Sequence, residues 1–125
     1  MRLFALLPLF LATPAFADPS MECPGSSQIE IGACVTETLA NVDAAMETAY
    51  SFALNAAGAL DTETGRADAL PALEAAQSAW LAWRDAECAF AGARFAGGSG
   101  TGIAITSCRI DLGRDRVTAL LEAAR

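Results

Sequence analysis

The residue types with most chemical potential are crowded into one stretch, AAQSAWLAWRDAECAF, at residues 75–90. It contains both tryptophans, one of the four cysteines and the adjacent pair Arg84 and Asp85, and most of the remainder is alanine. On an exposed surface, an arginine and an aspartate beside tryptophan rings would bind a partner, because guanidinium groups pair with carboxylates and stack on aromatic faces. Packed inward, the same residues would form a core.

The spacing of the cluster favours the structural interpretation over an exposed binding pair of Arg84 and Asp85. Trp80, Arg84 and Cys88 recur every four residues and therefore share one stripe of a helix. Cysteine is among the most buried residue types, so this stripe is expected to face inward. Arg84 is then expected to pair with a carboxylate such as Asp85, Glu87 or one on another helix, and Trp80, Trp83 and Phe90 to be the large core residues.

Absent residue types exclude several chemistries. The chain contains no histidine and no lysine. Activation of a serine or cysteine nucleophile by histidine, histidine ligation of a metal and Schiff-base formation are therefore excluded within this chain. No C-x-x-C motif occurs either, so we expect no metal site and no cofactor, and no catalytic residue is assigned.

The first 17 residues have the pattern of a secretory signal peptide. Arg2 precedes a short apolar run, and Ala15-Phe16-Ala17 resembles a cleavage site before Asp18. The run is too short for a membrane span, which needs ~20 apolar residues, and the residues before Cys23 do not fit lipid attachment, so no membrane anchor is expected. We expect residues 18–125 to form one domain, periplasmic or secreted.

The expected mature chain is strongly acidic. It keeps 15 acidic residues against 7 arginines, a net charge of −8. Nucleic-acid binding needs clustered cations, which this chain lacks, so a cationic protein partner suits it better.

The four cysteines, Cys23, Cys34, Cys88 and Cys108, are expected to form two disulfides, as in other small exported domains. Short-range pairing would join Cys23 to Cys34 and Cys88 to Cys108. However, Cys34 and Cys88 are equidistant from residue 61, taken as the centre of the turn between two long helices. They would then lie level in an antiparallel hairpin, within reach of a bridge. The prediction is therefore Cys34–Cys88 with Cys23–Cys108.

Three stretches have helical periodicity. The first opens with a capping box at Ser27-Gln28-Ile29-Glu30 and continues with apolar residues three and four apart to Ala53. Gly58 is its predicted stop, followed by a polar turn at 61–65.

The second predicted helix starts near Asp68, as its N-cap, and ends before Gly97. The segment GGSGTG, residues 97–102, is predicted to be a loop, and the third helix to run from Thr106 or Ser107 to the end. No strand alternation of useful length appears. The predicted fold is all-α: an antiparallel helical hairpin with a third packed helix, held by two disulfides.

Three motifs resemble the LprI-like family, small exported bacterial proteins named for a lysozyme inhibitor. They are AQSAWLAWRDAEC (76–88), GGS (97–99) and CRIDLGRDRVTAL (108–120). The resemblance implies an all-helical, disulfide-bonded periplasmic protein and a lysozyme inhibitor. The positions that it marks as structural are Tyr50, Gln77, Trp80, Trp83, Arg84, Asp85, Arg116 and Leu120.

These observations favour a binding protein, not an enzyme, with a cationic lysozyme as its partner. The candidate contact is the Gly/Ser loop with the arginine before it, because glycines let the backbone approach closely and hydroxyls can replace sugar hydroxyls. Its residues are Arg94, Gly97, Gly98, Ser99, Gly100 and Thr101. Two alternatives remain: an envelope-stress or structural interaction protein without lysozyme activity, and a small enzyme based on two facing carboxylates.

Overall fold

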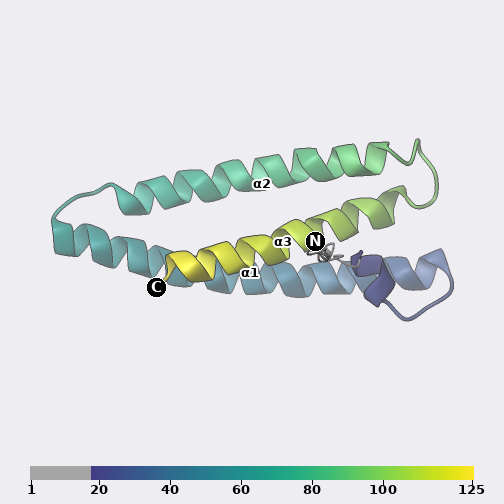
Figure 1. The fold of residues 1–125 in the computed structure, drawn as a ribbon, viewed down its shortest axis with the longest axis horizontal. Helices are drawn as coiled ribbons and strands as arrows, with labels where there is room; N and C mark the ends of the chain where they lie inside the picture. The colour runs from purple at the N-terminus through teal and green to yellow at the C-terminus, as the bar shows by residue number, and fades with distance from the viewer. Residues whose placement is uncertain (1–17) are drawn as a thin grey trace, which may run out of the picture.

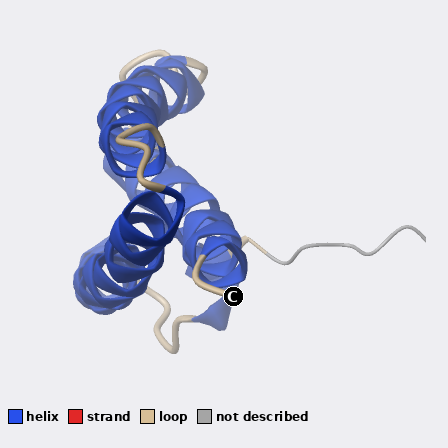
Figure 2. Ribbon diagram, turned by 90° about the vertical axis from the view of Figure 1, so that its left-hand side faces the viewer, coloured by secondary structure: helices blue, strands red, loops and turns tan. Residues whose placement is uncertain are grey.

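The computed structural model describes residues 18–125, which form one short 3₁₀ helix and three long α-helices (Figure 1). The predicted signal peptide, residues 1–17, lies outside the described residues. The elements are η1 (Pro19–Glu22), α1 (Gln28–Thr64), α2 (Ala69–Ala93) and α3 (Thr101–Ala123). Figure 2 shows helices and loops but no strand in this part of the chain. The predicted all-α fold with a third packed helix is confirmed.

The three helices leave one end of the molecule with fewer layers than the other. α2 runs back along α1, and α3 returns parallel to α1 and packs most extensively against it (Figure 1). Because α1 has 37 residues and α3 only 23, α3 ends partway along α1. We call residues 54–72 the hairpin tip and the remaining described residues the three-helix half. The tip contains no buried residue.

The start of α1 follows the prediction, but its end does not. In the capping box, the Glu30 amide donates to Ser27 Oγ at 3.2 Å, and the Ser27 amide donates to Glu30 Oε2 at 3.1 Å. Gly58 does not stop the helix, and the polar residues after it are helical, with the hydroxyls of Thr62 and Thr64 donating to carbonyls one turn back. The helix ends at Gly65, whose φ of 68° is left-handed.

The cap of α2 comes from α1 and not from the residue predicted. Asp68 occupies the N-cap position, but its side chain makes no capping bond. The carboxylate of Asp61 instead accepts from the amides of Asp68, Ala69 and Leu70 at 3.2, 2.8 and 3.0 Å. The backbone bonds from Leu70 and Ala69 hold the pKa of Asp61 below its usual value. One carboxylate therefore joins the two helices of the tip.

Both disulfides contradict the predicted pairing. The bonds join Cys23 to Cys34 and Cys88 to Cys108, with Cα atoms 5.9 and 5.5 Å apart. The error came from the position of the turn, which spans residues 65–68, about five residues beyond the assumed centre. The position that lies opposite Cys34 in the hairpin is therefore about ten residues, or ~15 Å, beyond Cys88 in the chain.

The three-helix half is held by close helix contacts and not by a wide core. Its largest fully buried side chains include Val35, Ile110 and Leu120. A Cβ atom on Gly113 of α3 would lie 2.6 Å from Val42 Cγ1 of α1, and one on Gly92 of α2 would lie 2.5 Å from Ile105 Cγ1 of α3. The glycines therefore let both neighbours approach α3 closely.

α3 starts earlier than predicted. α3 begins at Thr101, so Thr101 and Gly102 belong to its first turn and not to the loop. Ile103 and Ile105 therefore lie within the helix, and Ile105 packs against Gly92 of α2.

Candidate functional site

The tryptophan–arginine cluster, formed by Asp43, Gln77, Trp80, Arg84 and Arg116, lies where the three helices meet. Arg84 is buried, and its Nη1 donates to Asp43 Oδ1 of α1 at 2.8 Å. Two guanidinium carbons lie over the Trp80 ring, Arg84 at 5.2 Å and Arg116 at 5.6 Å from its centroid. Arg116 of α3 also donates from Nε to Gln77 Oε1 at 2.8 Å. Cation–π and polar contacts thus join all three helices.

Other positions marked by the sequence motifs surround this cluster. Trp80, Tyr50 and Val117 pack against a core that includes Met46 and Leu120. Burial lowers the pKa of Arg116, and the Coulomb interaction with Tyr50 opposes that shift. The cluster is therefore a joint between helices, with a small hollow of about 260 Å³ beside Asp43, Gln77 and Arg84.

Two aromatic residues of the same stretch do not take part. Trp83 is 48% exposed and Phe90 is 64% exposed, so the prediction that both are core residues is wrong. The helix face that contacts α1 and α3 follows Gln77, Arg84 and Cys88, and Trp83 and Phe90 lie off that stripe. The exposed Arg84–Asp85 pair does not form either: Asp85 instead pairs with Arg109, at 3.2 Å.

The loop between α2 and α3, residues 94–100, lies at the end of the three-helix half. It is a series of turns in which the Gly98 amide donates to the Phe95 carbonyl at 2.9 Å and Thr101 Oγ1 donates to the Gly98 carbonyl at 2.8 Å. Gly97 has a φ of 78°, which favours glycine. Ser99 is exposed, and α3 has no side-chain cap. Ser99 therefore does not cap α3.

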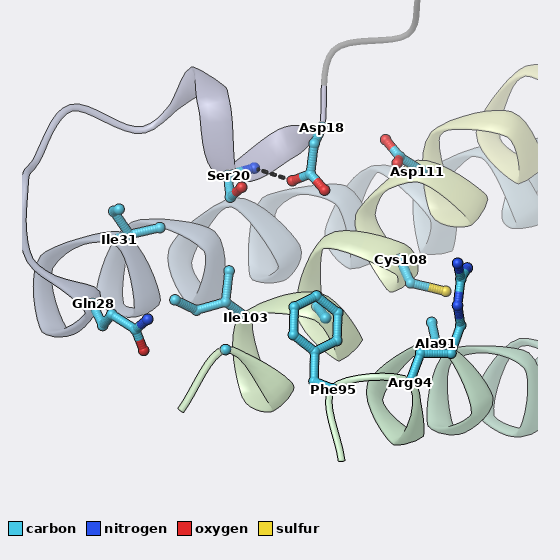
Figure 3. A pocket seen from close by; sticks show the side chains of 12 residues that line it. Asp18, Ser20, Gln28, Ile31, Ala91, Arg94, Phe95, Ile103, Cys108 and Asp111 are labelled. Atoms are coloured by element: carbon cyan, nitrogen blue, oxygen red, sulfur yellow. Dashed lines mark hydrogen bonds between the residues drawn. The ribbon is translucent and has the colours of Figure 1, made fainter. Parts of the chain in front are cut away.

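A cleft of about 640 Å³ lies on one side of this loop (Figure 3). Arg94, Phe95 and Gly100 contribute from the loop, and Ile103 and Asp111 from α3. The opposite wall comes from η1 and the start of α1. The residues of that wall are Asp18, Ser20, Gln28 and Ile31.

Two carboxylates of this cleft have pKa values displaced in opposite directions. Burial raises the pKa of Asp111, and the negative charge of Asp18 adds to that rise. Burial also acts to raise the pKa of Asp18, but hydrogen bonds from Ser20 outweigh it and the pKa is lowered. The Ser20 amide donates to Asp18 Oδ1 at 2.8 Å. Asp111 is therefore the carboxylate more readily protonated.

A second cleft of about 520 Å³ lies on the other side of the loop, between the starts of α1 and α3. Ser99, Gly102 and Ile103 line it together with Ile29, which is 86% exposed. The loop thus stands between two hollows, with Arg94 lining one and Ser99 lining the other.

The structure adds residues that the sequence reasoning missed. Phe95 lies within the candidate loop, and Asp18, Asp111 and Ile29 line the clefts beside it. Nothing in their sequence spacing joins these residues, because η1 is brought to the cleft only by the fold and by the Cys23–Cys34 disulfide. Among residues 18–125, no cysteine is free, no group of three or more potential ligands could hold a metal ion, and no helix is long and apolar enough to cross a membrane.

Comparison with known proteins adds two findings. A family model described as lysozyme inhibitor LprI matches residues 21–120. An uncharacterized protein of Rhizobium meliloti (strain 1021) is 33% identical over 121 residues, which cover 91% of this chain and 87% of that protein. No solved structure matches the chain.

Proposed function

Because the chain belongs to the lysozyme inhibitor LprI family, we propose that it is an exported protein that binds and inhibits a cationic lysozyme-type hydrolase. The observation that carries this proposal is the family match, which spans residues 21–120 and so includes both disulfides, the tryptophan–arginine cluster and the candidate loop. The two disulfides support export, because such bonds persist in oxidising compartments.

The proposed inhibitory element is the loop with its flanking arginine, Arg94 to Thr101. It projects from the end of the molecule that both disulfides brace, so it can enter a substrate cleft without large ordering costs. Ser99 offers an exposed hydroxyl, and Arg94 can pair with a catalytic carboxylate of the enzyme. Phe95 within the loop and Ile29 beside it are both exposed and supply apolar contacts.

The acidity of the chain supports a basic partner. Residues 18–125 carry a net charge of −8, which steers a cationic enzyme toward the inhibitor and speeds encounter. We therefore expect association to slow as ionic strength rises above ~0.15 M, where the screening length is about 8 Å.

The decisive experiment is a lysozyme activity assay with the purified mature protein. We expect wild type to inhibit, and the double variant Arg94→Ala, Ser99→Ala to lose most of that inhibition. The matched control is Arg66→Ala, Ser51→Ala, which removes the same two groups far from the loop. If wild type does not inhibit, the proposed function is wrong. If the loop double variant inhibits as well as the control double variant, only the proposed site is wrong.

A second candidate is a small hydrolase, because Asp18 and Asp111 line one cleft with pKa values moved apart, as in glycosidases. The same assay tests it when lysozyme is omitted. Clearing of a cell-wall suspension by wild type but not by Asp111→Asn supports hydrolysis. No clearing removes this candidate.

A further inference from the structure

The outer face of α2 carries an apolar seam that nothing in the described structure covers. Apolar residues recur along it at alternating intervals of four and three residues, the spacing of a coiled-coil seam. Every member is exposed. The large members are Trp83 and Phe90, and the small ones are Ala72, Ala76, Ala79, Ala86 and Ala93.

The two aromatic rings separate this seam from an ordinary alanine-rich surface. Exposed alanines alone need no explanation, because much of any protein surface is apolar. A tryptophan and a phenylalanine seven residues apart, both about half exposed or more, place large apolar area on one line of the helix. Neither ring contributes to the tryptophan–arginine cluster or to the clefts beside the loop.

We propose that this seam binds the seam of a second copy of the chain, with the two α2 helices antiparallel. A two-fold axis near Trp83 places the two Trp83 rings beside each other. It also places Phe90 of one copy against Ala76 of the other, and Ala79 within one residue of Ala86. Away from the Trp83 pair on the axis, the large side chain of Phe90 thus meets a small one, which permits the interdigitated packing that helix interfaces require.

The charges of α2 favour the same orientation. In the antiparallel pair, Glu87 lies level with Ala79 of the second copy, Asp85 with Leu81 and Glu74 with Gly92. In a parallel pair, each of these acids would lie level with its own counterpart and repel it. A second copy therefore fits the seam without close like-charge contacts, although the two acidic bodies repel each other at long range.

The size of the seam sets the strength of the dimer. α2 has 25 residues, so it is about 37 Å long, and a contact one helix wide buries about 800 Å² in total, at the weak end of specific interfaces. We expect a dimer with a micromolar dissociation constant. Added salt should strengthen it by screening the repulsion, the opposite of its effect on binding a cationic enzyme.

Sedimentation of the mature protein from micromolar concentrations to ~100 µM spans the range in which such a dimer forms. Wild type is expected to shift from monomer to dimer, and to dimerise more tightly at higher salt. Trp83→Glu should weaken dimerisation at least tenfold. The matched control is Phe52→Glu, which places the same charge at a 52% exposed aromatic on α1 and should leave the dimer unchanged.

Ala79→Glu provides a second seam variant that removes no large side chain, and circular dichroism establishes that each variant is folded. A wild type that stays monomeric over the whole range overturns the proposal. So does a dimer that both seam variants retain or that Phe52→Glu disrupts equally. If wild type is monomeric and Trp83→Glu weakens lysozyme binding, the seam belongs to a protein partner and the second-copy proposal is wrong.

Discussion

The three-helix half and the hairpin tip are held together by different forces. The three-helix half contains both disulfides, all the buried side chains and the close contacts at Gly92 and Gly113. The tip has two helices, no buried residue between 54 and 72, and one carboxylate, Asp61, that caps the second helix with the end of the first. The difference indicates that rigidity is concentrated at the end that carries the candidate loop.

Removing the disulfide that braces the loop is expected to have the largest effect. The double variant Cys88→Ala, Cys108→Ala opens the connection between α2 and α3, and Cys88 is fully buried. We expect the free energy of unfolding to fall by about 3 kcal/mol, measured by urea denaturation. If the loss is below ~1 kcal/mol, the size expected for a single hydrogen bond, the three-helix half is not braced as described.

The same substitution at two glycines should have opposite signs in the two regions. Gly113→Ala forces a methyl group onto Val42 and should destabilise the protein by about 1–3 kcal/mol. Gly58→Ala lies in the interior of α1, with nothing within 4 Å of the added Cβ atom, and should stabilise it by about 0.5–1 kcal/mol. Thermal unfolding of both variants checks the pair. Equal signs would show that the contrast in packing is wrong.

Removing the Asp61 carboxylate should loosen the tip and leave the other half unchanged. In Asp61→Ala the amides of residues 68–70 lose their acceptor, so amide exchange should accelerate within 54–72 and not around the disulfides. The folded pKa of Asp61 lies below its unfolded value, so its stabilisation is present above the unfolded pKa and is lost as pH falls through the folded pKa. Exchange that accelerates uniformly along the chain would contradict an independent tip.

The smallest expected effect is at Asp111, in the cleft beside the loop. Its pKa is raised by burial and by Asp18, so ionised Asp111 disfavours the folded state at neutral pH. Asp111→Asn should therefore raise the melting temperature slightly at pH 7. The gain should vanish below the unfolded pKa, where the wild-type carboxyl is protonated in both states. Glu122→Gln, which also removes an acid from α3 but not one that acts on Asp111, is the control; an equal gain there would indicate net charge as the cause.

How far the sequence predicts this molecule depends on whether the information is local. The Ser27–Glu30 capping box and the inward stripe of Arg84 and Cys88 were predicted because each depends on residues within one or two helical turns. The disulfide pairing failed because it depends on the register between helices, and a turn misplaced by about five residues changes which cysteines lie level.

The candidate site shows the same limit. The loop with Arg94 and Ser99 is visible in sequence because glycine and serine interrupt the helical pattern. Its neighbours Asp18 and Asp111 are not visible in the sequence, because they come together only when η1 packs against α1 and α3. Trp83 and Phe90 were predicted to be core residues and are exposed. Alanines occupy positions on both faces of α2, so periodicity alone did not indicate which face is covered.

Hydrogen–deuterium exchange of the mature protein with and without lysozyme tests most directly whether the braced end is the functional end. We predict slower exchange at 28–32 and 94–102 on binding, and unchanged exchange in the hairpin tip at 54–72. Protection centred on the tip, or protection at neither end in a protein that inhibits lysozyme, would contradict the account.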